Sequence, residues 1–361
     1  MNPVSKALSS KAVASPLEAR GAHLYRVAIV GGATLLGKEL AEVLRDRNFP
    51  AADIRLLDDD DTLGQLKAVG DEINFIQSIR SEQFERVDFA YFAADARSTK
   101  NNWKAASDLG DTIVDLTYAL EDKPGVSIRS PWIERLTNQP VAPDLQPGPV
   151  VVAHPAATVL ALLALRAGKA AKVERMVANV FEPASESGQK GMDELHEQTV
   201  NLLSFQELPK KIFDVQVAFN VLARFGQSSH LSLQEVSQRI VKHYRSIAPT
   251  AVELALQLLQ VPVFHGHGLS VYLEMEKPVS VADLSLAFAG DHVVLNVGPD
   301  ESPTNVSAAG QGDIQLSITP DATQANGVWM WATTDNLRIA ALTAVECAET
   351  MTTSRPTGQI Q

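Results

Sequence analysis

A glycine-rich turn near the start of the chain has residue types that could hold a phosphate. The apolar run at residues 27–30 is followed by a turn that contains Gly31, Thr34, Leu36 and Gly37, and then by a segment with helical periodicity. Glycines after a buried strand let the backbone approach a pyrophosphate, whose charge is stabilised by free N–H groups and the helix dipole. The pattern predicts a dinucleotide-binding turn, in which the β-carbon of Thr34 narrows the approach.

Two other interpretations of this turn stay open. Read as Gly32-x4-Gly37-Lys38-Glu39, it resembles the phosphate loop of an NTPase. That loop needs a Ser or Thr in the last position to hold magnesium, and the Glu39 carboxylate would instead repel the phosphate. The turn could also serve only to pack a helix against a strand.

A run of acidic residues follows the second apolar run, at residues 54–57. In dinucleotide-binding folds an acidic residue here accepts the ribose hydroxyls of NAD, whereas Arg or Lys accommodates the phosphate of NADP. The run therefore allows NAD and disfavours NADP. A solvated charge run without a ligand is the alternative. The residues concerned are Asp58, Asp59, Asp60 and Asp61.

His265 and His267 have a spacing that metal sites use, and Cys347 is the only cysteine. In a strand both imidazoles would point to one face, but no acidic or thiol partner is apparent in the sequence, so we expect no zinc site. One cysteine excludes an internal disulfide framework and a thiolate metal cluster. We expect Cys347 to be a small buried hydrophobe in the last helix.

Composition limits the classes of function. The chain has 361 residues and a net charge of −12, which repels nucleic acid and anionic membrane surfaces alike. No apolar run reaches the roughly 20 residues that a transmembrane helix needs. We expect a cytoplasmic protein that binds neither nucleic acid nor membranes. Residues 1–25 are rich in Ser and Ala and predict a disordered extension, with a transit peptide as the alternative.

Strand-like runs alternate with helical segments in the first part of the chain. The runs lie at 27–30, 54–57, 87–93 and 113–116. Such alternation implies right-handed crossovers and a parallel sheet buried on both faces. The sequence therefore predicts a Rossmann-type doubly wound α/β domain over residues 26–150.

The remainder mixes both kinds of element, which predicts a larger α+β domain. Helices are expected at 158–167, 191–203, 233–245 and 338–351. Strands are expected at 150–153, 173–181, 252–258, 261–264, 269–273 and 328–332.

Several short motifs occur in a fixed order over residues 26–352. They include Gly188-Gln-Lys-Gly191, Val261-Pro-Val-Phe264 and Thr334-Asp-Asn-Leu-Arg338. Together they resemble the aspartate-semialdehyde dehydrogenase family and, within it, the USG-1 paralogues. The resemblance implies a dinucleotide domain completed by a C-terminal helix at 338–352, a dimerisation and substrate domain at 151–337, and a homodimer.

Family chemistry is the reductive dephosphorylation of an acyl phosphate through a cysteine thioester, with a His as general base and NADPH as hydride donor. The resemblance matches the base to His267 and the nucleophile to Ala157, which has no thiol. Two arginines that bind substrate anions match Glu121 and Gln260. Asn336 lies in a segment near the cofactor.

Two further positions bear on the chemistry. Glu182 stands where the family carries an active-site Gln. Thr158, next to the position of the missing nucleophile, offers a hydroxyl that would need strong activation to attack a carbonyl.

These replacements favour a member that has lost catalysis and acts as a dimeric scaffold or regulatory binder. In this hypothesis His267 is a vestigial base, no cofactor is required, and the partner is a small molecule or a protein. The alternative is an NAD(P)-dependent oxidoreductase with altered chemistry, acting on an aldehyde or oxo group, in which His267 serves directly as acid or base.

Overall fold

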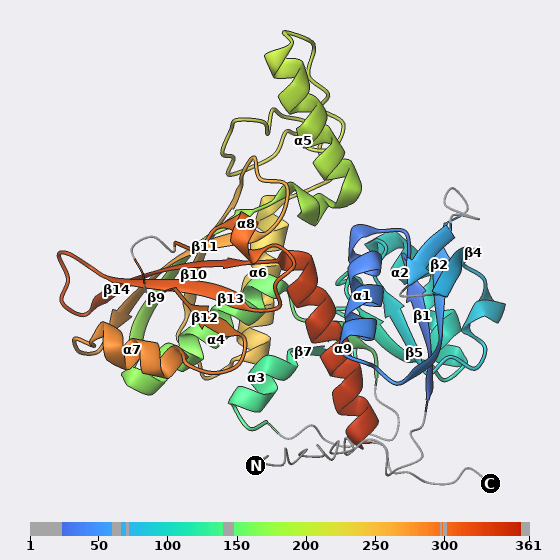
Figure 1. The fold of residues 1–361 in the computed structure, drawn as a ribbon, viewed down its shortest axis with the longest axis horizontal. Helices are drawn as coiled ribbons and strands as arrows, with labels where there is room; N and C mark the ends of the chain where they lie inside the picture. Colours follow the sequence, from blue (N-terminus) through green and yellow to red (C-terminus); the bar gives the residue numbers. More distant parts are fainter. Residues whose placement is uncertain are drawn as a thin grey trace, which may run out of the picture.

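A computed structural model describes residues 24–59, 66–69, 72–139, 148–296, 298 and 302–354. The chain forms two sheets that lie beside each other, with the last helix, α9 (Asn336–Ser354), between them (Figure 1). Within this described part of the chain, no helix combines the length and apolar character that crossing a bilayer requires.

The first sheet has the strand order β3-β4-β2-β1-β5-β6-β8-β7. All neighbouring pairs in it are parallel except β3 with β4. Its strands are β1 (Tyr25–Val30), β2 (Ala51–Asp58), β3 (Leu66–Val69), β4 (Glu72–Ser78), β5 (Phe89–Phe92), β6 (Thr112–Asp115), β7 (Ser127–Arg129) and β8 (Val150–Val152). The helical segments of this part are α1 (Leu35–Asp46), η3 (Ser81–Phe84), α2 (Ala96–Asp108) and α3 (Pro131–Leu136).

Both faces of the first sheet are covered, as expected for a doubly wound sheet. Val27 and Ile29 of β1 pack in one apolar cluster with α1 and α9, whereas Ala28 and Val30 pack in another with α2. Because successive strand residues point to opposite faces, a run of apolar residues is required when both faces are buried. The predicted α/β class and the doubly wound sheet are confirmed.

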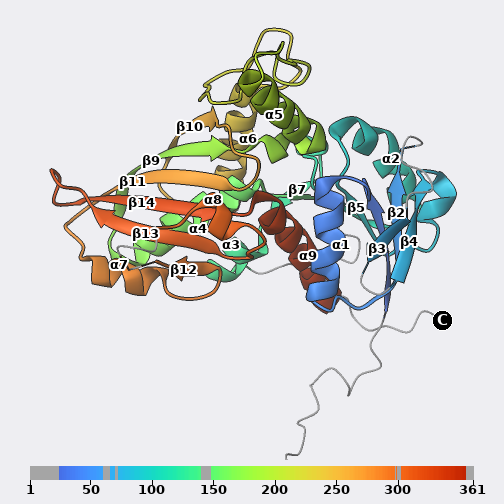
Figure 2. The same ribbon diagram turned by 45° about the horizontal axis from the view of Figure 1, so that its top comes forward.

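The second sheet is mixed and has the order β10-β9-β11-β14-β13-β12. Its strands are β9 (Val173–Glu182), β10 (Leu254–Gln260), β11 (His267–Met275), β12 (Val293–Leu295), β13 (Ile314–Pro320) and β14 (Gly327–Thr334). The accompanying helices are α4 (Pro155–Ala170), η4 (Ala184–Ser187), α5 (Gly188–Leu203), α6 (Leu233–Ile247), α7 (Val281–Phe288) and α8 (Asn305–Ala308). Figure 2 shows β9, β11, β14 and β13 side by side, with α4 behind them.

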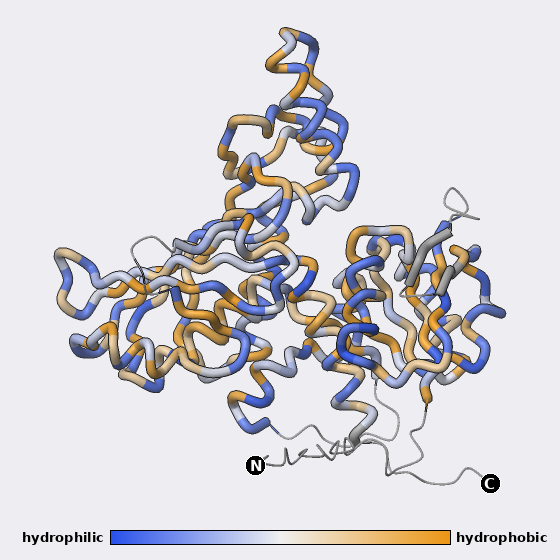
Figure 3. The backbone as a smooth tube through the Cα atoms, in the orientation of Figure 1, coloured by the Kyte–Doolittle hydropathy of each residue, from blue (hydrophilic) through white to orange (hydrophobic). Residues whose placement is uncertain are grey.

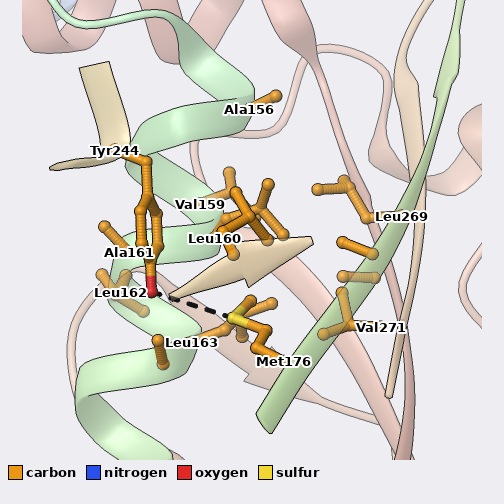
Figure 4. Packing of buried hydrophobic residues seen from close by; sticks show 14 of the residues in the cluster. Ala156, Val159, Leu160, Ala161, Leu162, Leu163, Met176, Tyr244, Leu269 and Val271 are labelled. Carbon is orange, nitrogen blue, oxygen red and sulfur yellow. Dashed lines mark hydrogen bonds between the residues drawn. The ribbon is translucent and has the colours of Figure 1, made fainter. Parts of the chain in front are cut away.

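Helix α4 is the centre of the larger core. Nearly all of its residues are buried, and Leu160 and Leu163 share a cluster with Met176 of β9 and Leu269 of β11 (Figure 4). Coloured by hydropathy, α5, which projects from the body, mixes hydrophilic and hydrophobic residues (Figure 3). The core fixes the first turn of α4, which the functional site uses.

One predicted strand is wrong, and part of the predicted N-terminal extension lies outside the described residues. Residues 261–264 form no strand, because Pro262 has no N–H and the carbonyls of Val263 and Phe264 accept hydrogen bonds from Ala184 and Ser185 of η4. Of the predicted extension, residues 1–23 lie outside the described part, and β1 begins at Tyr25.

Candidate functional site

A cleft of about 590 Å³ lies where the two sheets meet. Its first wall consists of the segments that follow β1, β5, β6 and β8, so it lies at the C-terminal ends of parallel strands. The other wall consists of the segment after β9, part of α6 and the first turn of α9. In the first sheet β1 is flanked by β2 on one side and β5 on the other, and doubly wound folds bind ligands at this kind of switch point.

The glycine turn forms one end of the cleft. Gly31 has a φ of +96°, and a β-carbon at Gly37 would collide with the Gly31 carbonyl, so both positions require glycine. Thr34 caps α1: its Oγ1 accepts the Gly37 N–H at 2.9 Å and donates to the Gly31 carbonyl at 2.8 Å. The N–H groups of Leu35 and Leu36, which have no partner within the helix, are in the part of the turn that lines the cleft.

Asp58 supports this turn from the end of β2. Its Oδ2 accepts the Ala33 N–H at 2.8 Å and its Oδ1 accepts the Asp59 N–H at 2.9 Å. The residues present fit a nicotinamide dinucleotide, because first-turn N–H groups lie at the cleft and a carboxylate stands at the end of β2. Asp60 and Asp61 lie outside the described residues.

His267 is the first residue of β11 and is completely buried behind the cleft. Its Nε2 lies 3.3 Å from Glu186 Oε1, although the two do not have hydrogen-bond geometry. Burial lowers the pKa of His267, so the imidazole is neutral at pH 7. Asn336 donates to Glu186 Oε1 at 2.7 Å and accepts the Gly266 N–H at 3.0 Å. Asn336 thus lines the cleft and holds the segment that carries His267.

His265 does not share a face with His267, because it precedes β11 in a loop. Its Nε2 lies 2.8 Å from Asp335 Oδ2, and its Nδ1 lies 3.1 Å from Ser185 Oγ. Burial acts to lower the pKa of His265, but the bond to Asp335 outweighs it and the net shift is upward. The expectation that both imidazoles lie on one strand without an acidic partner is therefore wrong. Among the described residues, no group of three or more His, Cys, Asp or Glu side chains is arranged to hold a metal ion.

The first turn of α4 lies beside His267. The ring of His154, which precedes α4, is 5.9 Å from the ring of His267, so the segment matched to the nucleophile does face the matched base. Ala157 is completely buried in that turn, and the Thr158 hydroxyl donates to Ser130 Oγ at 3.2 Å. The structure thus places the residue that caps α4, three positions before Ala157, next to His267.

Cys347 is elsewhere. It is buried among the apolar residues between α9 and the first sheet, and burial raises its pKa to about 12. Such a thiol is protonated at neutral pH and inert as a nucleophile.

Comparison with known proteins identifies the family. Residues 26–147 match the semialdehyde dehydrogenase NAD-binding domain, and residues 162–339 match the semialdehyde dehydrogenase dimerisation domain. A USG-1 protein homolog from Pseudomonas aeruginosa is 31% identical over 334 residues, covering 90% of this chain and 96% of that protein. The chain belongs to the aspartate-semialdehyde dehydrogenase family. The predicted resemblance is confirmed.

Two further similar proteins support this family assignment. An aspartate-semialdehyde dehydrogenase from Rickettsia bellii is 27% identical, covering 90% of this chain and 97% of the relative. The solved structure of a probable aspartate-semialdehyde dehydrogenase from Pseudomonas aeruginosa superimposes with a TM-score of 0.81 at 26% identity, covering 91% and 99% of the two chains. The NAD-binding domain supports a nicotinamide dinucleotide as the cofactor class.

A charged network that was not expected from the sequence includes Arg239, which lines the cleft. Glu121 contacts Arg239 Nε at 3.1 Å, His243 Nε2 at 2.8 Å and Lys242 Nζ at 3.6 Å. Burial alone would raise the pKa of Glu121, but the contacts from His243 and Arg239 lower it to about 2. The Arg239 guanidinium lies 5.1 Å from the centre of the Tyr118 ring, and both side chains line the cleft.

A local signal for this network exists in the sequence. Arg239, Lys242 and His243 are three and four residues apart and so share one face of α6. Their partner is not local, because Glu121 precedes Arg239 by 118 residues.

Proposed function

We propose that this family member binds a nicotinamide dinucleotide and a small ligand in the cleft and does not carry out thioester chemistry. The observation that carries the proposal is Ala157 in the first turn of α4, a helix whose capping residue His154 lies beside His267. A covalent intermediate requires a nucleophile at that place. Cys347 is buried on the other side of α9, and the Thr158 hydroxyl is engaged by Ser130.

The anion-binding positions support the same conclusion. Gln260 is neutral, and Glu121 is a carboxylate that neutralises Arg239 from within the protein. An acyl phosphate would meet a repulsive charge where the family has a cation, and losing a bidentate guanidinium contact removes a strong, directional bond.

For the dinucleotide we propose NAD rather than NADP. The Asp58 carboxylate at the end of β2 would accept ribose hydroxyls and repel a 2′-phosphate. A bound nicotinamide ring supplies or accepts hydride. The chain's own groups at that end of the cleft are the Leu35 and Leu36 N–H groups, which would bind the pyrophosphate, and Asn336, which orients Glu186.

We also propose a cytoplasmic homodimer. The outer face of the second sheet supports dimerisation, because Trp329 on β14 is 43% exposed and its ring centre lies 5.0 Å from that of Tyr272 on β11. The segment after α5 exposes Phe205 by 98%. Large apolar side chains on a free face are typical of an interface. Sedimentation at micromolar concentration should give a dimer, and a monomer alone would contradict this part of the proposal.

The decisive experiment combines binding and turnover. NAD should raise the melting temperature more than NADP does, because a ligand that binds only the folded state stabilises it. Steady-state assays with aspartate semialdehyde, phosphate and either dinucleotide should show no turnover.

A second candidate is an oxidoreductase with altered chemistry that acts on an aldehyde or oxo group. The 3.3 Å approach of Glu186 to His267 favours it, because a nearby carboxylate stabilises the protonated imidazole. A panel of simple aldehydes and ketones tests it. Robust turnover that His267→Ala abolishes, while an exposed control such as His230→Ala does not, would replace the first proposal by this one.

A further inference from the structure

Four polar side chains form one continuous row across the second sheet. Gln260 of β10 pairs in register with Glu182 of β9, and His267 of β11 pairs with Thr334 of β14. Because Gly268 pairs with Phe181, Glu182 is also next to His267. Side chains in register on adjacent strands lie on the same face, so the four residues are direct neighbours. Each is at most 4% exposed.

The row lies where the apolar core ends. One step deeper along the same strands, the neighbours in register are Leu258, Val180, Leu269 and Ala332, all of which are buried in the core under α4. On the other side is the cleft, which Glu182 itself lines. A ligand that enters the cleft can therefore reach the row at Glu182.

Each member of the row has a buried polar atom without a hydrogen-bond partner among the described residues. These atoms are Gln260 Oε1, Glu182 Oε2, His267 Nδ1 and Thr334 Oγ1. The amide of Gln260 is held in place because its Nε2 donates to the carbonyls of Glu182 at 2.9 Å and Val261 at 3.0 Å. Buried polar groups cost free energy unless they are paired, so such a row indicates a place for a hydrogen-bonding ligand group.

The row offers no cation to that group. Arg239 is the cation that acts on Glu182, and it is engaged by Glu121. The carboxylate of Glu186 is 3.3 Å from His267, and its charge opposes an incoming anion. Burial raises the pKa of Glu182 and lowers that of His267, so it disfavours the charged form of both side chains.

We infer that the row receives an uncharged hydrogen-bonding group of carboxamide type, and that it discriminates against carboxylate and phosphate. The inference rests on the proposed function, because it names the ligand class of the same cleft. The NH₂ group of a carboxamide has two hydrogens, one for Glu182 Oε2 and one for Gln260 Oε1 on the adjacent strand, and the group brings no charge to a buried place.

Butanamide and butanoate are a matched pair for the test, since they have similar size and differ in charge. Calorimetric titration of the full chain at pH 7, with and without saturating NAD, should show millimolar butanamide binding that is on the order of tenfold tighter than that of butanoate. Gln260→Arg should reverse the preference. Gln257→Arg is the control, because Gln257 lies on the same strand but is exposed.

If Gln260→Arg does not fold, Gln260→Leu replaces it and should weaken butanamide binding on the order of tenfold, with Gln257→Leu as its control. Equal affinities, tighter butanoate binding, or no binding of either compound by the native chain would overturn the inference. If NAD still raises the melting temperature, those results leave the proposed function standing. Turnover of aspartate semialdehyde would instead contradict the proposed function. The relative affinities for butanamide and butanoate would still test the inference about the row.

Discussion

Replacing Glu121 by Gln tests the charged network that Glu121 forms with Arg239, a residue that lines the cleft. The side chain of Glu121 is 12% exposed, and its pKa falls from the ordinary 4.5 to about 2. Each pKa unit corresponds to about 1.4 kcal/mol, so the ionised form contributes at most about 3 kcal/mol to the free energy of unfolding. Because the folded-state pKa is depressed, that contribution is present above pH 4.5 and is lost as the pH falls towards 2.

Urea denaturation of both proteins measures this difference. At pH 7, Glu121→Gln should lower the free energy of unfolding by about 3 kcal/mol, and the gap should narrow to about 1 kcal/mol at pH 3. Glu253→Gln is the matched control, because Glu253 forms an exposed ion pair with Arg245 at 2.6 Å. Such surface pairs contribute at most about 1 kcal/mol. A gap for Glu121→Gln that stayed constant with pH, or equalled that of the control, would refute the reasoning.

Three further predictions concern the first sheet and its surroundings. Thr34→Ala should lower the free energy of unfolding by about 1 kcal/mol in urea denaturation, since it removes the cap of α1, and Thr34→Ser should retain the stability. Burial, with a smaller effect from Asp88, raises the pKa of Asp111 from 3.8 to about 7, so native stability should fall by at most about 4 kcal/mol as the pH rises from 4 to 7. In Asp111→Asn that component of the pH dependence should be absent, and a profile identical to that of the native chain would contradict it. Cys347 should react with a thiol reagent only after denaturant is added, because it is completely buried; rapid labelling of the native protein at pH 8 would show the burial to be incorrect.

Local pattern accounts for much of the fold. The glycine turn, its preceding strand and the helix after it follow from an apolar run, two obligatory glycines and a helical period, and the structure has β1 and α1 there. The second sheet was harder to predict. Its strands β12 and β13 are short or half-exposed, so their sequences lack the continuous apolar run that identified β1, β2, β5 and β6 of the first sheet.

The site was predicted in part. The segment matched to the nucleophile lies near His267, where His154 contacts its ring, because the family resemblance carries information about contacts between distant segments. The pairing of Glu121 with Arg239 and the row that contains Gln260 depend on strand register and on elements far apart in the chain. The hydrophobic periodicity of one segment does not show which distant segment it pairs with. In the sequence, a polar residue at the end of an apolar strand has the same pattern whether it is solvated or buried.

Helix α9 has a consequence for how the chain is made. Its residues Ala341, Ala344 and Val345 complete the apolar cluster on Val27 and Ile29, at the opposite end of the sequence. Arg338 also bonds to Glu39 and Asp46 of α1 at 2.9 Å and 2.7 Å. Until α9 has been synthesised, part of one apolar face of the first sheet therefore stays uncovered beside α1. We expect this half of the protein to reach its native state only after α9 has been synthesised, and to be prone to aggregation until then.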